Sequence, residues 1–172
     1  DESTIAVIET PSFQLEMFGE CGRAPHVAVI TNLYQDHLSR HKTMEGYALA
    51  KANIFKNQTE NDFLVLNKEN DWTEFFLKQN PKAKVVFSSE VDLPGLNTDL
   101  FISKFGEHNL KNFLTASASC LSVGINSEQI IAAIDSLPQI KWREELVYDK
   151  DGLKIYNDTA STSPEAFISA AK

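Results

Sequence analysis

Four short apolar runs stand out in the first half of the chain, at residues 5–8, 26–31, 63–66 and 85–87. Runs without polar alternation are typical of parallel strands that are covered on both faces. Segments with helical spacing lie between them, one at residues 44–55 and another after Asn70. Alternating strands and helices predict an α/β fold with a mostly parallel sheet and flanking helices.

The second half of the chain changes character and predicts further helices. Residues 109–123 are rich in small side chains and follow Gly106, which favours a helix. Ser127 is predicted to cap a second helix that runs to residue 136. A third helix is expected to start at Ser163, which Pro164 follows in the first turn.

A β-hairpin is predicted between these helices. Residues 146–149 and 153–156 are two strand-like segments on either side of an Asp151-Gly152 pair. Asp-Gly is a strong signal for the two-residue turn that joins antiparallel strands.

Composition narrows the class of protein. The chain has 172 residues, 42% of them hydrophobic, which fits one globular domain over residues 1–172. A net charge of -8 disfavours non-specific binding to nucleic acid or to an anionic membrane, and no run is long enough to span a bilayer. Cys21 and Cys120 form no C-x-x-C pair, so a disulfide framework is not expected. We therefore expect a cytoplasmic protein.

Both ends of the sequence predict a fragment. The first expected strand begins almost at residue 1, and the last expected helix has barely begun at Lys172. The seven glycines never form G-x-x-x-x-G-K-[ST], so the chain has no P-loop of its own.

Three residues are candidates for a metal site. Glu9 and His37 each follow a predicted strand, and neighbouring parallel strands end at the same sheet edge, where ligands bind. A carboxylate and an imidazole there could ligate a divalent cation. Lys51 lies in the next predicted helix near Tyr47 and Ala48, on a face that looks partly buried. Periodicity alone favours a lysine whose amine reaches water.

Polar residues in the second half suggest a nucleotide site. Asn109 and Asn112 share a helical face after His108 and could read an adenine edge, although Asn also caps helices. Arg143 suits a phosphate or a surface ion pair, and Asp158 suits a ribose hydroxyl or a turn cap.

The order of these motifs resembles the Mur ligase family, most closely its members that add D-glutamate. The resemblance rests on six segments that span nearly the whole chain: residues 7–16 (VIETPSFQLE), 31–37 (TNLYQDH), 47–55 (YALAKANIF), 106–112 (GEHNLKN), the Arg143 segment and 156–165 (YNDTASTSPE).

The resemblance implies a function. It is ATP-dependent amide bond formation through an acyl-phosphate, with UDP-N-acetylmuramoyl-L-alanine and D-glutamate as substrates and ATP and Mg²⁺ as cofactors. The pathway would be peptidoglycan synthesis, and so cell-wall biogenesis, cell shape and cell division. The chain would be most of the central ATP-binding domain of a monomeric enzyme, without the P-loop, the N-terminal uridine-nucleotide domain and the C-terminal domain, and inactive alone.

The resemblance also implies residue roles, with Lys51, His37 and Arg143 as the catalytic set. Glu9, His37 and a carbamylated Lys51 would hold Mg²⁺. Arg143 would also contact phosphate, and ATP would further meet His108, Asn109, Asn112 and Asp158. Ser12 and Thr162 would contact substrate.

Three positions depart from the family pattern: Pro11 replaces a frequent Ser, Ala160 a frequent Lys, and Ser39 a common Asp. The first two change the expected substrate contacts. The alternatives are another Mur ligase, a folylpolyglutamate synthase, or a non-catalytic nucleotide-binding module.

Overall fold

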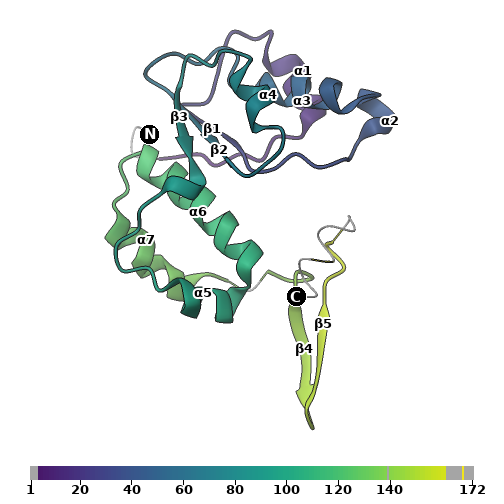
Figure 1. Cartoon of the computed structure of the whole chain (residues 1–172), viewed down its shortest axis with the longest axis vertical. Helices are drawn as coiled ribbons and strands as arrows, with labels where there is room; N and C mark the ends of the chain where they lie inside the picture. Colours follow the sequence, from purple (N-terminus) through teal and green to yellow (C-terminus); the bar gives the residue numbers. More distant parts are fainter. Residues whose placement is uncertain (1–3, 139, 162–167, 169–172) are drawn as a thin grey trace. The chain divides into compact units, whose positions relative to one another are not determined.

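The computed structural model describes residues 4–138, 140–161 and 168, and the chain forms two compact units (Figure 1). Unit 1 comprises Asp1–Asp92 and Lys111–Ile125, and unit 2 comprises Leu93–Leu110 and Asn126–Lys172. The grouping of all 172 residues into one domain stays a prediction.

A three-stranded parallel sheet forms the centre of unit 1 (Figure 1). Its strands are β1 (Val27–Ile30), β2 (Phe63–Leu66) and β3 (Lys84–Phe87), in the order β1-β2-β3. The links between strands contain helices, namely α2 (Leu38–His41) and α3 (Met44–Ala52) before β2, and α4 (Thr73–Leu77) before β3. The predicted α/β class with a parallel sheet is confirmed.

The strand register explains why the apolar runs are continuous. Ala28, Leu64 and Val85 are paired across the sheet, as are Ile30, Leu66 and Phe87, so these six side chains share one face. That face packs against α3 and α4 in one buried cluster, which includes Tyr47, Ala48, Ala52 and Phe76. On the opposite face Val65 is also completely buried. Apolar residues at consecutive positions are therefore needed to cover both faces.

Unit 1 also contains a short helix that the sequence did not reveal and part of a long one. Helix α1 (Ser12–Phe18) starts directly after Pro11 and buries Ser12 and Leu15. The long helix α6 (Glu107–Ser122) matches its predicted position. Within unit 1 it is tied to the loop after β2 by an ion pair of 2.8 Å between Lys111 and Glu69.

Unit 2 contains helix α5 (Thr98–Phe105), helix α7 (Ser127–Ala133), the 3-10 turn η2 (Ile134–Ser136) and a hairpin. A further 3-10 turn, η1 (Ser88–Glu90), belongs to unit 1. The predicted cap of α7 is wrong by one residue. Asn126, not Ser127, caps the helix, because its side chain accepts from the Gln129 amide while the Gln129 side chain accepts from the Asn126 amide.

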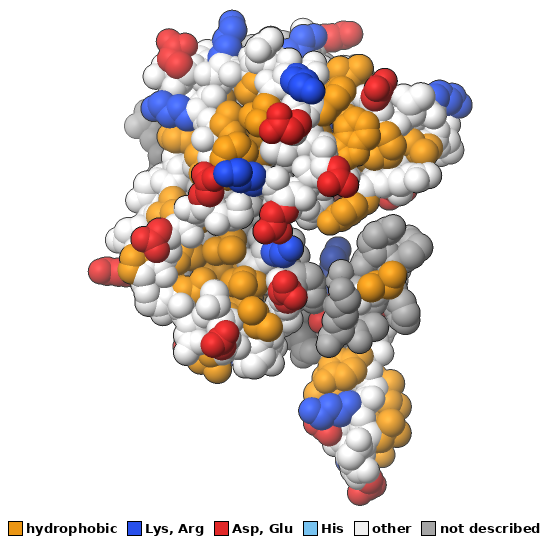
Figure 2. All heavy atoms as spheres, viewed as in Figure 1, with side chains coloured by type: hydrophobic (Ala, Val, Ile, Leu, Met, Phe, Trp, Pro, Cys, Tyr) orange, Lys and Arg blue, Asp and Glu red, His pale blue; other side chains and the backbone are white. Residues whose placement is uncertain are grey.

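The hairpin consists of β4 (Glu145–Lys150) and β5 (Leu153–Asn157) and confirms the predicted turn. Asp151 and Gly152 both have positive φ, 54° and 77°, which the two-residue turn requires. Figure 2 shows hydrophobic side chains at the surface of this hairpin. They include Val147, Leu153 and Tyr156, each more than half exposed.

The strand predicted at residues 5–8 does not form, and the description of Glu9 as the end of a strand is therefore wrong. Ile5, Val7 and Ile8 are 60%, 95% and 78% exposed, and residues 4–11 belong to no regular element. An apolar run becomes a strand only where another strand completes its backbone hydrogen bonds. Among the described residues, no strand pairs with residues 5–8.

The helix predicted to begin at Ser163 lies outside the described residues. Within the described part of the chain, no helix combines the length and the apolar character needed to cross a membrane.

The packing predicts a large cost for shortening a sheet residue. Leu66 is 1% exposed, so Leu66→Ala should lower the free energy of unfolding by about 2–5 kcal/mol, measured by urea denaturation. Leu49→Ala is the matched control, because Leu49 on α3 is 50% exposed and should cost less than about 0.5 kcal/mol. Equal losses would contradict the assigned core.

Candidate functional site

The loop after β1 carries His37 in an unusual backbone conformation. Its φ is 54°, in the left-handed region, which costs a residue other than glycine roughly 1–2 kcal/mol. The neighbouring Asp36 holds it there, because the Asp36 carboxylate accepts from the His37 amide at 2.7 Å and lies 3.6 Å from the imidazole. Backbone strain of this kind is commonly kept where a side chain has a functional task.

Tyr47, on the first turn of α3, links two of the three predicted metal-site residues. Its ring and the His37 ring form a T-shaped pair with 5.7 Å between centroids. The Lys51 amine, four residues further along the helix, lies over the same ring at 5.2 Å. The Tyr47 ring is itself in the core, 7% exposed, so it offers both side chains a fixed surface.

The start of α3 is fixed by its cap. Thr43 accepts a hydrogen bond from the Gly46 amide at 3.0 Å, which sets where the helix begins. Tyr47 and Lys51 therefore have defined directions, because both lie within the next two turns.

The electrostatic environment of Lys51 includes Glu9. Burial lowers the pKa of the Lys51 amine from its ordinary value, and the attraction of the nearby Glu9 carboxylate opposes part of that shift. Burial also raises the pKa of the Tyr47 hydroxyl, with a further contribution from Asp36. The lysine amine therefore gives up its proton more readily than an exposed lysine does.

His37 and Lys51 thus both contact the Tyr47 ring, and Glu9 acts on Lys51 through its charge. As they stand they are not a complete metal cage, since no group of three His, Cys, Asp or Glu side chains in the described residues could hold a metal ion. If Lys51 carried a carboxylate, the set would become one imidazole and two carboxylates. Such ligands fit a divalent cation that keeps several waters.

Beside this group lies a second network that the sequence did not predict. The His41 imidazole, 4% exposed, exchanges a hydrogen bond of 2.9 Å with the Ser12 hydroxyl and lies 3.5 Å from Glu16. Arg40 donates to both oxygens of the Glu16 carboxylate, at 3.2 and 2.6 Å. The hydrogen bond from Arg40 lowers the pKa of the Glu16 carboxyl, although desolvation opposes the shift. The positive charges of Arg40 and His41 lower it further. Ser12, predicted to contact substrate, is 4% exposed and bonded to His41.

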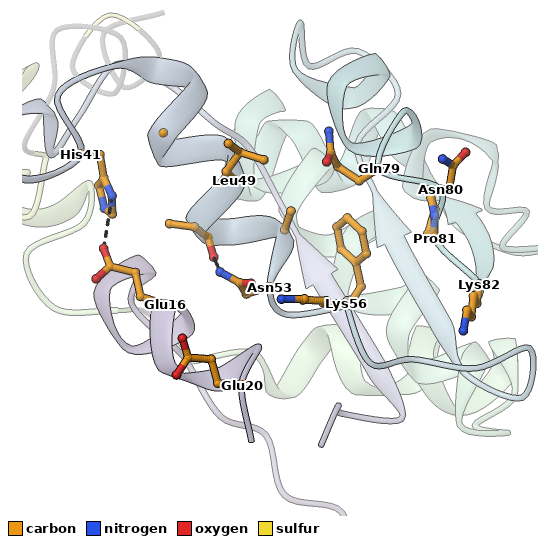
Figure 3. A pocket seen from close by; sticks show the side chains of 14 residues that line it. Glu16, Glu20, His41, Leu49, Asn53, Lys56, Gln79, Asn80, Pro81 and Lys82 are labelled. Atoms are coloured by element: carbon orange, nitrogen blue, oxygen red, sulfur yellow. Dashed lines mark hydrogen bonds and ion pairs between the residues drawn. The ribbon is translucent and has the colours of Figure 1, made fainter. Parts of the chain in front are cut away.

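A hollow of about 650 Å³ borders this network in unit 1 (Figure 3). Figure 3 shows Glu16 and His41 facing each other on one side and Gln79, Asn80 and Lys82 on the other. None of Glu9, His37 or Lys51 lines it. We therefore place the candidate site at Tyr47 and not in the hollow.

The residues predicted to contact adenine lie at the start of α6. Asn109 donates from its side-chain amide to the carbonyl of Phe105, the last residue of α5, at 2.8 Å, so this side chain ties the end of α5 to the start of α6. Asn112 lies one turn later, as predicted. The side chain of His108 lies outside the described residues.

Arg143 and Asp158 lie at the base of the hairpin in unit 2. Arg143 is exposed just before β4, and Asp158 follows β5. The Asp158 carboxylate accepts from the Glu144 amide at 3.2 Å and from the Ser161 hydroxyl, so it fastens the two ends of the hairpin together. This is the turn-capping use that the sequence left open. Thr162 lies outside the described residues.

A protein-family match covers the first half of the chain. The family model described as "Mur ligase middle domain" matches residues 1–92, more than half of the chain. The chain belongs to the Mur ligase family.

Curated Mur ligases match almost the whole chain. A UDP-N-acetylmuramoylalanine–D-glutamate ligase from Roseiflexus sp. (strain RS-1) is 34% identical over 99% of this chain and 42% of its own length. A ligase of the same name from Caldanaerobacter subterraneus subsp. tengcongensis is 37% identical over 95% of this chain and 39% of its own length. The chain therefore spans about two fifths of these relatives.

A solved Mur ligase shares the fold. The crystal structure of MurF from Acinetobacter baumannii aligns with a TM-score of 0.69 over 93% of this chain and 38% of its own, at 20% identity. At that identity the likeness supports the α/β architecture and no finer assignment.

The environment of Lys51 predicts a stability change that depends on pH. The pKa of the Lys51 amine is lower in the folded chain than in the unfolded chain, so the unfolded chain binds more protons between the two pKa values. Protonation of Lys51 therefore disfavours folding at pH values below the unfolded-state pKa of about 10.4. In buffer freed of bicarbonate, Lys51→Met should raise the midpoint of thermal unfolding at pH 7, and the gain should shrink as pH rises toward that value. The exposed Lys56→Met is the control and should change little at any pH.

Proposed function

We propose that this chain supplies the metal-handling and part of the ATP-handling machinery of a ligase that joins D-glutamate to UDP-N-acetylmuramoyl-L-alanine. The observation that carries the reaction class is that His37 and Lys51 contact one Tyr47 ring, with the Glu9 charge acting on Lys51. The choice of D-glutamate rests on the names of relatives that match 95–99% of the chain. Such an enzyme works in the cytoplasm, in peptidoglycan precursor synthesis, and thereby serves cell-wall biogenesis, cell shape and division.

Lys51 is the residue whose chemistry this proposal changes most. An uncharged amine attacks carbon dioxide, forms a nitrogen–carbon bond and releases one proton, which leaves a carbamate with a negative charge. Burial favours the uncharged amine that this step needs. The product places a second carboxylate-like group beside Glu9 and His37, in a site that then suits Mg²⁺.

The reaction requires charge neutralisation more than covalent help from the protein. A carboxylate is a poor electrophile, so the substrate carboxylate takes a phosphoryl group from ATP to give an acyl-phosphate, which the D-glutamate amine attacks as phosphate leaves. Bound Mg²⁺ would reduce the repulsion between the ATP oxygens and the substrate carboxylate. Glu9, His37 and carbamylated Lys51 would hold and orient it.

The remaining assignments are proposals for the nucleotide and the substrate. Arg143 would stabilise negative charge on the transferred phosphoryl group, a role its exposed guanidinium leaves open. His108, Asn109 and Asn112 would contact adenine, and Asp158 the ribose. Ser12 and Thr162 would contact substrate. The relatives are about two and a half times as long as this chain, so these roles belong to the complete protein.

The test is phosphate release by the protein made from the complete reading frame, with ATP, Mg²⁺, UDP-N-acetylmuramoyl-L-alanine and a panel of amino acids. We expect release with D-glutamate alone. Release with a different amino acid would keep the chemistry and overturn the D-glutamate assignment. Release with none would favour a non-catalytic nucleotide-binding module.

A charge-removing variant tests the role of Arg143. Arg143→Ala should lower kcat by on the order of a hundredfold, because losing one contact to the developing charge costs about 3 kcal/mol of barrier. Lys141→Ala is the matched control, since Lys141 is also exposed and lies two residues away. Equal, small effects of both changes would remove Arg143 from the catalytic set.

A further inference from the structure

We propose that His41 is a positioning residue for the metal site, acting through the Tyr47 ring on His37 and Lys51. This inference rests on the proposed function, because it concerns the same metal site. None of the roles proposed above places His41 in contact with ATP or substrate.

The His41 imidazole is held from two sides. Its Nε2 lies 2.9 Å from the Ser12 hydroxyl and its Nδ1 lies 3.5 Å from the Glu16 carboxylate, and Ser12 and Glu16 share one face of α1. Arg40 clamps the same carboxylate through two hydrogen bonds, and its guanidinium lies 5.7 Å from the Phe13 ring centroid. With the side chain only 4% exposed, this ring has little freedom to turn.

The flat face of the His41 imidazole packs against the Tyr47 ring. The two rings stack at 5.1 Å between centroids with an interplanar angle of 23°. The same Tyr47 ring meets His37 edge-on at 5.7 Å and carries the Lys51 amine at 5.2 Å. A shift of the Tyr47 ring would therefore move the surface on which both proposed metal-site residues rest.

The backbone also fixes the spacing between His41 and α3. A Cβ atom added at Gly46 would come within 2.6 Å of the His41 carbonyl oxygen, which is closer than atoms can approach without movement. Only glycine allows the end of α2 to lie this close to the first turn of α3. The stack of His41 on Tyr47 is thus set by both side chains and main chain.

In this arrangement residues 12–16 influence the metal site indirectly, through His41. Ser12 and Glu16 do not need to reach the reacting groups to affect them. They hold the imidazole that supports Tyr47. Residues that orient metal ligands from behind typically change metal affinity or activity by about 10–100-fold when they are removed.

The test measures metal binding and turnover in the protein made from the complete reading frame. We expect His41→Ala and Tyr47→Leu each to weaken Mn²⁺ binding, followed by electron paramagnetic resonance, by about tenfold. The Mg²⁺ concentration for half-maximal phosphate release should rise by a similar factor, with KM for ATP unchanged. Tyr47→Phe keeps the ring and should stay within about twofold of the unaltered protein.

Two controls separate positioning from general damage. His26→Ala removes another histidine of unit 1, one that pairs with Asp62 at 3.0 Å, and should leave Mn²⁺ binding unchanged. The double variant His41→Ala with Tyr47→Leu should bind Mn²⁺ no more weakly than the poorer single variant, because both remove one support. Full additivity, or unchanged Mn²⁺ binding in His41→Ala, would overturn the inference.

Variants of the proposed ligands show which claim has failed. If His37→Ala and Lys51→Ala weaken Mn²⁺ binding and His41→Ala does not, the metal site stands and the positioning role is wrong. If His37→Ala and Lys51→Ala both leave Mn²⁺ binding unchanged, the metal site itself is wrong and the role of His41 falls with it.

Discussion

The burial of the Tyr47 ring is the constraint on which the candidate site depends. One side of the ring belongs to the core formed by α3, α4 and the parallel sheet. The same ring contacts His37, His41 and Lys51, which come from two helices and the loop between a strand and a helix. A rigid aromatic surface anchored in a packed core can hold polar side chains more accurately than a loop can. The stability of the fold and the geometry of the site are therefore set by the same residue.

The sheet was predictable because its signal is local. Each of β1, β2 and β3 is a short apolar run, and their register explains why hydrophobic residues stand at consecutive positions. The hairpin was also predictable, since Asp151-Gly152 supplies the positive φ values that its turn needs. Residues 5–8 carry the same apolar signal and form no strand, because the signal reports what a segment can bury and not whether a partner strand is present.

The site was predictable in part. The i, i+4 spacing of Tyr47 and Lys51 placed both on one helical face, and the loop position of His37 was evident from the strand that precedes it. The Ser12–His41–Glu16 network was not, because it joins residues 29 positions apart through α1, a helix with only Ser12 and Leu15 buried. The left-handed backbone of His37 was not predicted either; the adjacent Asp36 side chain, which accepts from the His37 amide, supports it. Family resemblance supplied the proposed roles, and the structure supplied the contacts of His37 and Lys51 with Tyr47.

The most direct test of the central claim is anomalous diffraction from crystals of the protein made from the complete reading frame, grown with Mn²⁺, bicarbonate and an ATP analogue. The account predicts a metal peak bounded by Glu9, His37 and a carbamate on Lys51, with the Tyr47 ring still stacked on His41. A metal peak away from these residues, with an unmodified Lys51 amine over Tyr47, would contradict it.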